Sequence, residues 1–456
     1  METKKKNNGS MIDKLSQWSQ KYIPDALPLV LALTFVVAVL ALILTPTNPI
    51  ELAQCWYDGF WSLLNFTINI VMLMFTGFLV ANSKPVAKGL SALAKKPKTT
   101  KSAVFLFMIV TIILFYIHFA LGMAAAIVFG KALIVEQNKK GNKLPIGLIA
   151  AAAGFCIVFQ AGPTASAPLT VSTPGHFIED VIGIITMDKT MFTLPIILMN
   201  VIMAVIFLIV FPRIAAKDNG SIDDSEILAR LEREVEEAQA DRKVEAKSFA
   251  DKMDQFAWFQ IALGVIGLIL VIISVAKGGL SKLGFNSVNM FFFTLAMILT
   301  KNPAGLAKAA KESIGSVTGV VLQFPFYAGI FGILNGSGLG AVLTEFFVSI
   351  SSPRMFTSVV LWFSSLLNML VPSGGSQFVV EAPYIMPAAL ELGVDAGKVV
   401  SAFTCGDLLT NLIQPFWAIP VLSAFGVKFR KIFPYCLIAF AIAFVVVSGT
   451  FLFFAY

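Results

Sequence analysis

Charged residues are scarce in this chain: Asp, Glu, Lys and Arg make up 13% of its 456 residues, whereas hydrophobic residues make up 57%. A water-soluble domain usually carries about twice that share of charge. The composition therefore excludes a soluble domain and indicates a polytopic membrane protein. The net charge of +7 does not point to nucleic acid, because the Lys and Arg residues lie in short loops between apolar runs, as in the cytoplasmic loops of membrane proteins.

Side chains for metal, redox and covalent chemistry are also few. The two histidines, His118 and His176, are too isolated to form a metal site, and the sequence contains no HExxH, GxSxG or P-loop motif. The four cysteines lack metal-binding spacing, and we interpret them as small core residues: Cys55, Cys156, Cys405 and Cys436. The sequence thus predicts no cofactor, no metal and no enzymatic activity.

Long apolar runs predict an all-α protein with nine membrane crossings. If the N-terminus is cytoplasmic and the C-terminus lies outside the inner membrane, every short Lys/Arg cluster except Lys277 and Lys282 falls on the cytoplasmic side. The first run is too long for the apolar region of a signal peptide, so we expect it to remain as a helix. The predicted crossings are residues 27–44, 61–80, 145–169, 192–211, 256–275, 285–300, 316–334, 397–422 and 432–453.

Two further apolar segments must enter and leave the membrane on the same side. Residues 103–134 have Lys-rich loops at both ends and are interrupted at residues 116–122. Residues 356–390 are interrupted by Pro372-Ser373-Gly374-Gly375, and each limb has about 15 residues, or roughly 22 Å as a helix, which is shorter than a hydrocarbon core of about 30 Å. We interpret both segments as re-entrant hairpins with tips near mid-membrane; two full crossings joined by a surface turn are the alternative.

An internal repeat relates the two halves of the chain. The hexapeptide Asn48–Ala53 recurs in similar form at Asn302–Ala307. At a constant offset of 252 residues, glycines and prolines recur in the same order: Gly77 with Gly329, Gly122 with Gly374, Gly154 with Gly406, Pro163 with Pro415 and Pro168 with Pro420. Five predicted crossings separate the starts of the two copies, and an odd number inverts the second copy.

The repeat predicts how the chain is organised. Inverted repeats with paired interruptions are typical of secondary transporters whose binding site lies at the bilayer midplane. The expected segments are a first inverted repeat at 1–212 (hairpin 103–134, broken helix 145–169), a charged cytoplasmic linker at 213–255, a connecting helix at 256–276 and a second inverted repeat at 285–456 (hairpin 356–390, broken helix 397–422).

The interruptions supply candidate binding residues. A broken helix exposes N–H groups that carry about half a positive charge, and these can bind an anion without a cationic side chain. No Lys or Arg lies deep inside a predicted crossing, so an anionic substrate would rely on such groups. The candidates are Gln160, Gly162, Thr164 and Ser166 in the first half, Ser373, Gly374, Gly375, Ser376, Gln377 and Gln414 in the second, and His118 at the first hairpin's interruption.

Each of these candidates also has a structural interpretation. Serine and threonine in a helix break commonly cap the freed backbone groups. A lone histidine such as His118 more often hydrogen-bonds a carbonyl than binds a ligand. Capping and ligand binding are compatible at the same residue.

Two acids lie deep in predicted membrane segments. Glu381 is in the second limb of the second hairpin, and Asp407 is in the second broken helix, one turn before Asn411. Because an intramembrane carboxylate is costly, we interpret these three residues as a candidate site for a coupling ion, H⁺ or Na⁺. The alternative is a static hydrogen bond, for Asp407 with Asn411, Gln414 or Thr404.

Five short motifs resemble the bacterial short-chain fatty acid transporter family. They are Gln323–Gly329, Val371–Gly375, Gln414–Pro420, Asp58–Trp61 and Ser172–Gly175, and the resemblance extends from about Trp18 to the C-terminus. The chain departs from the family pattern of a third glycine, a tryptophan and a Gln-Gly-Pro sequence, because Ser376, Phe378, Glu381 and Ala382 stand at those positions. An acid thus replaces a neutral amide.

The resemblance implies a carrier of small monocarboxylates, such as acetoacetate or butyrate, in the cytoplasmic membrane. A more distant similarity to the ion-transporter superfamily implies an elevator mechanism, in which a hairpin-bearing transport domain slides against a scaffold. The first hypothesis is therefore a secondary transporter that couples a short-chain monocarboxylate to H⁺ or Na⁺. An uncoupled anion channel or facilitator and a carrier of a different small carboxylate are the alternatives, and assembly as a homo-oligomer is left open.

Overall fold

The computed structural model describes residues 26–217, 225–239, 248–414 and 418–453, and every regular element in these ranges is a helix. Eight of the described helices are long and apolar enough to cross a membrane. The prediction of an all-α polytopic membrane protein is confirmed. Three predicted features lie outside the described residues: the sides of the membrane on which the two termini lie, the start of the family resemblance at Trp18, and the motif residues Pro415, Phe416 and Trp417.

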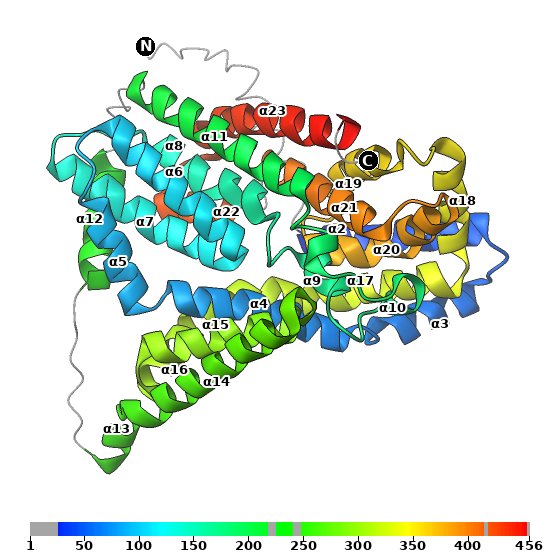
Figure 1. The fold of residues 1–456 in the computed structure, drawn as a ribbon, viewed down its shortest axis with the longest axis horizontal. Helices are drawn as coiled ribbons and strands as arrows, with labels where there is room; N and C mark the ends of the chain where they lie inside the picture. Colours follow the sequence, from blue (N-terminus) through cyan, green and yellow to red (C-terminus); the bar gives the residue numbers. More distant parts are fainter. Residues whose placement is uncertain (1–25, 218–224, 240–247, 415–417, 454–456) are drawn as a thin grey trace, which may run out of the picture.

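The helices form two layers, which are the lower and upper parts of Figure 1. In the lower layer α3 packs against α17, α15 packs against α4 and α14, and α2 packs against α17. The lower layer comprises α2 (Ala26–Leu44), α3 (Pro49–Phe60), α4 (Leu64–Ala81), α14 (Ala257–Gly278), η4 (Gly279–Lys282), α15 (Phe285–Thr300), α16 (Pro303–Ser313), η5 (Ile314–Val317) and α17 (Thr318–Gly336).

The upper layer contains the two interrupted segments of each half. Its helices are α6 (Thr100–Ile117), α7 (Phe119–Lys139), α8 (Ile146–Phe155), η1 (Cys156–Gln160), α9 (Ser166–Val171), α11 (Leu194–Lys217), α19 (Phe356–Leu367), α20 (Gly374–Glu391), α21 (Ala396–Thr410), α22 (Ala418–Phe425) and α23 (Phe429–Phe453). The connecting helices α5 (Lys84–Ala94) and α18 (Leu339–Ile350) join the layers at opposite ends of the molecule (Figure 1).

Two short helices that were not predicted as crossings, α3 and α16, begin at an Asn cap. The side chain of Asn48 accepts hydrogen bonds from the N–H groups of Ile50 and Glu51, and Pro49 begins α3. In the same way, Asn302 accepts from the Gly305 N–H (2.8 Å), and Pro303 begins α16. An Asn cap followed by Pro is a strong helix start, so the repeated hexapeptide marks the beginning of a helix in both halves.

The pair α6–α7 occupies the left of Figure 1, and the pair α19–α20 occupies the right. A single extended residue, His118, joins α6 to α7, whereas residues 368–373 join α19 to α20. Both junctions point toward the middle of the molecule (Figure 1). The chain also breaks at residues 161–165, between η1 and α9, and after Thr410, between α21 and α22.

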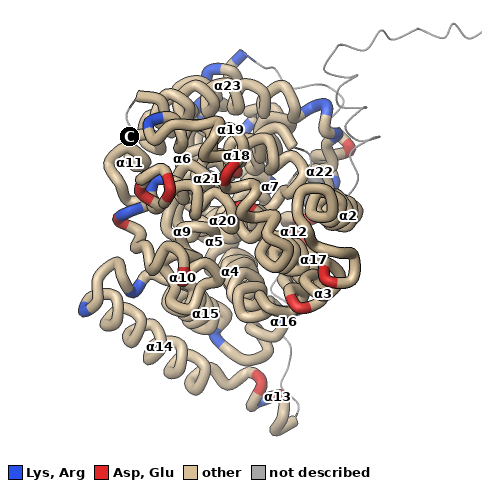
Figure 2. The backbone as a smooth tube through the Cα atoms, turned by 90° about the vertical axis from the view of Figure 1, so that its right-hand side faces the viewer, with Lys and Arg blue, Asp and Glu red and all other residues tan. Residues whose placement is uncertain are grey.

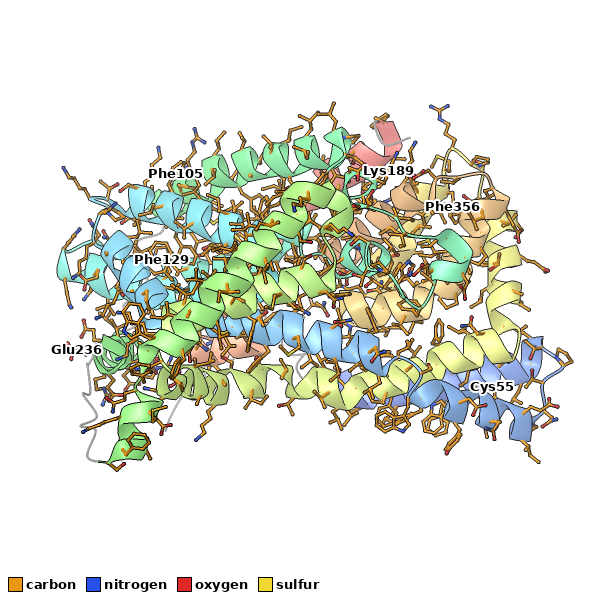
Figure 3. All side chains as sticks on the ribbon, turned by 60° about the horizontal axis from the view of Figure 1, so that its bottom comes forward. Cys55, Phe105, Phe129, Lys189, Glu236 and Phe356 are labelled. Carbon is orange, nitrogen blue, oxygen red and sulfur yellow. The ribbon has the colours of Figure 1, made fainter. Side chains whose placement is uncertain are left out.

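Charge is confined largely to the ends and the loops. The lower-layer helix α14 is apolar and uncharged over most of its length (Figure 2). The linker forms α12 (Ser225–Gln239), which packs against α7 through an ion pair between Lys131 Nζ and Glu234 Oε2 (2.6 Å). Glu236 of α12 and Cys55 of α3 lie near opposite ends of the long axis (Figure 3). The shorter elements are α10 (Glu179–Ile182), η2 (Met187–Lys189) and α13 (Phe249–Asp254).

Candidate functional site

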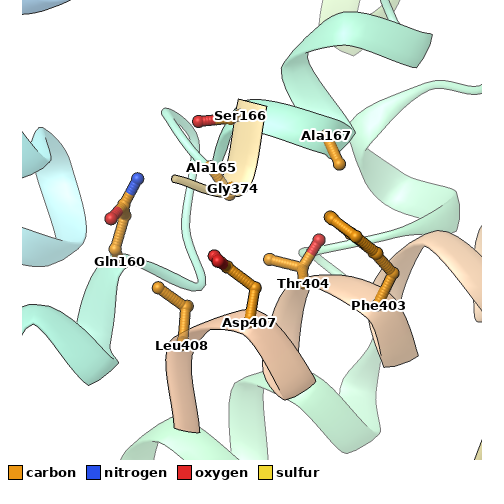
Figure 4. Close-up of a pocket in the computed structure, with 9 residues that line it drawn as sticks. All are labelled: Gln160, Ala165, Ser166, Ala167, Gly374, Phe403, Thr404, Asp407 and Leu408. Carbon is orange, nitrogen blue, oxygen red and sulfur yellow. The ribbon is translucent and has the colours of Figure 1, made fainter. Parts of the chain in front are cut away.

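A small cavity lies where the first broken helix meets the second hairpin and the second broken helix. Its volume is about 10 Å³, enough for one water molecule. It is lined by Gln160, Ala165, Ser166 and Ala167 from the first break, by Gly374 at the start of α20, and by Phe403, Thr404, Asp407 and Leu408 of α21 (Figure 4). A carboxylic acid with several carbon atoms would need the surrounding segments to separate.

The start of α20 presents free backbone N–H groups near this cavity. Ser373 is the N-terminal cap in an extended conformation, but its side chain makes no capping hydrogen bond. The first helical bond runs from the Gln377 N–H to the Ser373 carbonyl (2.8 Å), so the N–H groups of Gly374, Gly375 and Ser376 precede it. The hydroxyl of Ser376 donates to that of Ser373 (3.2 Å). The turn therefore has the polarity of an anion site.

Asp407 is the acid that faces the cavity. Asp407 is 5% exposed, and its Oδ1 is buried without a hydrogen-bond partner among the described residues. No hydrogen bond joins its carboxyl to Thr404, Asn411 or Gln414, the described candidates for a static bond. Thr404 Oγ1 donates to the Val400 carbonyl (2.7 Å), and Asn411 Oδ1 accepts from Asn368 Nδ2 (3.0 Å) and from Gln414 Nε2. Figure 4 shows the Asp407 carboxyl turned toward the gap between α21 and the first break.

Glu381 has a different environment from Asp407. It is fully buried, and its two carboxyl oxygens accept hydrogen bonds from Ser364 Oγ (2.6 Å) and Gln377 Nε2 (2.6 Å). Gln377 Nε2 also donates to the Ser364 carbonyl (2.7 Å). Because Ser364 is on α19 and Gln377 and Glu381 are on α20, this cluster ties the two limbs of the second hairpin together, away from the cavity lining.

A second polar cluster joins α19 to α21. Asn368 Nδ2 donates to the Asp407 carbonyl (2.8 Å), and Ser365 Oγ donates to the Gly406 carbonyl (3.0 Å). In return, Thr410 Oγ1 donates to the Ser365 carbonyl (2.7 Å). These bonds fix the part of α21 that carries Asp407. No sequence motif predicted this cluster, although Ser364, Ser365 and Asn368 form a polar stripe at the end of α19.

The remaining candidates of the first half lie around the cavity in supporting positions. Gln160 and Ser166 line it. Thr164 Oγ1 donates to the Ile117 carbonyl (3.4 Å), and Gly162 lies against the backbone of Tyr116. His118 is buried and caps α7, since its Nδ1 accepts from the N–H groups of Ala120 (3.2 Å) and Leu121 (3.5 Å). The structure places Gly162, Thr164 and His118 at the first hairpin's tip and not in the cavity lining.

The other candidates of the second half surround Gly374. Ser373, Gly375, Ser376 and Gln377 are on its turn, but Gly374 is the residue of this group that lines the cavity. Gly375 faces the lower layer, where an added methyl group would lie 3.3 Å from Phe324 Cζ and 3.5 Å from Ile70 Cδ1. Gln414 bonds to Asn411 at the end of α21. Within the described ranges no three His, Cys, Asp or Glu residues form a metal-binding group.

Comparison with known proteins gives a consistent family. The model of the family described as short chain fatty acid transporter matches residues 9–454. A protein of Escherichia coli named short-chain fatty acid transporter is 30% identical over 440 residues, which cover 94% of this chain and 97% of that protein. A protein of the same name from Haemophilus influenzae is 31% identical over 447 residues, with 94% and 97% coverage.

Two solved structures share the fold at low sequence identity. The YdaH transporter of Alcanivorax borkumensis is 16% identical with a TM-score of 0.57, and the alignment covers 93% of this chain and 98% of that one. MtrF of Neisseria gonorrhoeae, whose structure is described as illuminating a class of antimetabolite efflux pumps, is 13% identical with a TM-score of 0.55 and 97% coverage of both chains. These two likenesses show the fold alone.

Proposed function

The chain belongs to the short chain fatty acid transporter family, and from that premise we propose that it is a secondary carrier of short-chain monocarboxylates, such as acetoacetate or butyrate, coupled to H⁺ or Na⁺. It is a multi-pass membrane transporter and not an enzyme. We place it in the cytoplasmic membrane with its N-terminus inside and its C-terminus outside, because the Lys-rich loops then face the cytoplasm.

The observation that carries the proposal is the uncapped start of α20 beside a buried cavity. The described lining residues include no Lys or Arg, so the positive end of α20 is the feature there that attracts an anion. Ser373 and Ser376 add hydroxyl donors, and Gln160 and Ser166 also line the cavity. A short apolar tail would lie against Ala165, Ala167 and Phe403. This combination suits a small monocarboxylate.

We further propose that the two halves are inverted repeats, at residues 1–212 and 285–456, joined by the linker 213–255 and the helix 256–276. Each half has the same order of elements: an Asn-capped helix, a long apolar helix, a connecting helix, a hairpin, a broken helix and a long final helix. The two hairpins enter from opposite ends of the molecule (Figure 1), which supports an inverted relation.

The two layers support an elevator mechanism. In this proposal the upper layer, with both hairpins and the cavity, is the transport domain, and the lower layer is the scaffold. The layers meet at aromatic side chains: Phe66 of α4 packs against Phe177 of the α9–α10 connection (ring centroids 5.4 Å apart), and Phe177 packs against Phe378 of α20 (5.7 Å). The aromatic contacts lack directional hydrogen bonds, but Ser172 Oγ donates to the Leu283 carbonyl (2.8 Å) and the Phe285 N–H donates to Thr173 Oγ1 (2.9 Å), so sliding would break these two bonds.

Uptake by purified protein in liposomes tests the function. Labelled acetoacetate should enter faster than into protein-free liposomes, through which neutral acid also diffuses, and unlabelled short-chain monocarboxylates should compete with it. Uptake that responds to an imposed H⁺ or Na⁺ gradient distinguishes a coupled carrier from an anion channel or facilitator. Stronger competition by dicarboxylates or amino acids would favour a carrier of a different carboxylate.

Removing both tip hydroxyls should weaken substrate binding without loss of the protein. In the double variant Ser373→Ala and Ser376→Ala, two donors to the carboxylate are lost, each contributing roughly 1 kcal/mol, so the half-saturating concentration should rise about tenfold or more. The measurement is concentration-dependent uptake at equal amounts of reconstituted protein. Ser349→Ala, at an exposed serine on α18, is the matched control and should behave as wild type. An unchanged half-saturating concentration in the double variant would mean that the hydroxyls serve only the backbone turn.

A further inference from the structure

An acidic side chain stands where the proposed substrate anion would bind. A methyl group added to Gly374 would lie 2.6 Å from Asp407 Oδ2, so the Asp407 carboxyl is in close contact with the first turn of α20. The same carboxyl lines the cavity, and its Oδ1 is buried and unpartnered among the described residues. Asp407 and a substrate carboxylate would therefore compete for the same N–H groups.

The surroundings offer little to compensate a second negative charge. Among the elements packed against α21, helices α9 and α19 carry no titratable side chain. α20 adds Glu381, which is bonded to Ser364 and Gln377, Tyr384, which stacks on Phe347, and the exposed Glu391 at its last position. η1 and α23 add Cys156, Cys436 and Tyr435, and the basic residues Arg430 and Lys431 are in the first turn of α23. None of these residues lines the cavity.

We propose that Asp407 carries the coupled proton, so that one proton crosses the membrane with each monocarboxylate. The inference rests on the proposed function and specifies its coupling. When the site is loaded, Asp407 is neutral and its hydroxyl donates to the substrate carboxylate, which accepts from the α20 N–H groups as well. When the substrate leaves, the proton leaves with it, and the ionised Asp407 interacts with those N–H groups itself. One anion and one proton together move no net charge.

The geometry favours a proton over a metal cation at this position. A hard cation needs several oxygen ligands around it, and Asp407 supplies the one carboxylate among the described lining residues, since Glu381 is bonded to Ser364 and Gln377. A proton needs no ligand shell.

Substitution Asp407→Asn tests the assignment, because an asparagine is permanently neutral and keeps the shape and a donor of the protonated acid. In the variant, exchange of labelled for unlabelled acetoacetate should slow, because Asp407 is part of the substrate site, but it should stay measurable above the background of protein-free liposomes. The stimulation of net uptake by an inward proton gradient should be lost, after subtraction of protein-free liposomes. The matched control is Asp395→Asn on the same helix, where Asn also serves as an N-terminal cap and gradient stimulation should persist.

The other outcomes contradict the assignment in distinct ways. Gradient-stimulated uptake by Asp407→Asn would overturn it, as would a folded Asp407→Asn protein that no longer exchanges. If Asp407→Asn does not fold, Asp407→Ser, which is also neutral, replaces it in the same assays with the same criteria. Wild-type uptake driven by Na⁺ and not by the proton gradient would assign coupling to the metal ion. Failure of the proposed function itself would differ from all of these, because wild-type protein would then exchange no short-chain acid.

Discussion

Replacement of Gly374 by Ala should reduce acetoacetate uptake about a hundredfold while leaving the protein folded. The added methyl carbon would lie 2.6 Å from Asp407 Oδ2, closer than a carbon and an oxygen can approach without a bond. The carboxyl is the end of a side chain and can rotate away, so the fold survives. The substrate site loses both the open first turn of α20 and the position of the acid. Two hydrogen bonds to a charged group together contribute about 3 kcal/mol or more, which corresponds to roughly a hundredfold.

Gly449→Ala is the matched control for this prediction. Gly449 is near the C-terminal end of α23, and a methyl group there would meet no atom within 4 Å. Alanine is a better helix former than glycine, so the Gly449→Ala protein should fold in the membrane and should take up acetoacetate at the wild-type rate. If the Gly374→Ala protein took up acetoacetate at the wild-type rate, at equal protein in the same liposomes, the first turn of α20 would not bind the substrate.

Local signals in the sequence account for most helix positions. Helix α15 spans the predicted residues 285–300, whereas helix α20 begins at Gly374, inside the predicted Pro-Ser-Gly-Gly turn. Proline and glycine end helices through their own backbone properties, and lysines mark the ends of membrane segments, so neither signal depends on the tertiary structure. The layer arrangement depends on contacts between distant helices, and no local pattern specifies it.

The roles of the two buried acids could not be separated from sequence. Glu381 and Asp407 are each a single carboxyl in an apolar helix, and both are candidates for coupling on that ground alone. The rotation of each helix about its axis decides the difference: Asp407 faces the cavity, whereas Glu381 faces Ser364 on the other limb of its hairpin. Serines in apolar helices commonly bond to their own backbone, so Ser364 gave no reason to expect a partner for Glu381.

The two proposed repeats have the same order of helices but different side chains at the positions of the two acids. At the offset of 252 residues, Phe129 corresponds to Glu381 and Phe155 to Asp407. Both phenylalanines are fully buried, and Phe155 packs against Phe207 and Phe211. The first half thus has an aromatic core where the second half has carboxyl groups. We expect substrate coupling to depend on the second half, with the first contributing Gln160 and Ser166 at the cavity.

Replacement of Glu381 by Leu should destabilise the second hairpin more than any other single change at the site. The carboxyl is fully buried and accepts the Ser364 hydroxyl and the Gln377 amide, and a leucine accepts neither. Each buried donor left without a partner costs about 1–3 kcal/mol, so the total loss is roughly 2–6 kcal/mol. In detergent, the temperature at which half of the protein loses its monodisperse state should fall by about 2–6 °C.

Glu381→Gln separates the hydrogen bonds from the charge. Glutamine keeps one acceptor oxygen and adds an amide that can donate, so it can retain part of the cluster, and we expect most of the thermal stability to remain. Combining Glu381→Leu with Ser364→Ala and Gln377→Leu removes the unpaired donors together with the acid, and this triple variant should recover stability relative to Glu381→Leu alone. A triple variant less stable than Glu381→Leu would show that leucine is rejected for its shape. In that case the bonds of Glu381 to Ser364 and Gln377 would not hold α19 to α20. The bonds between α19 and α21 would then have to fix the position of Gly374.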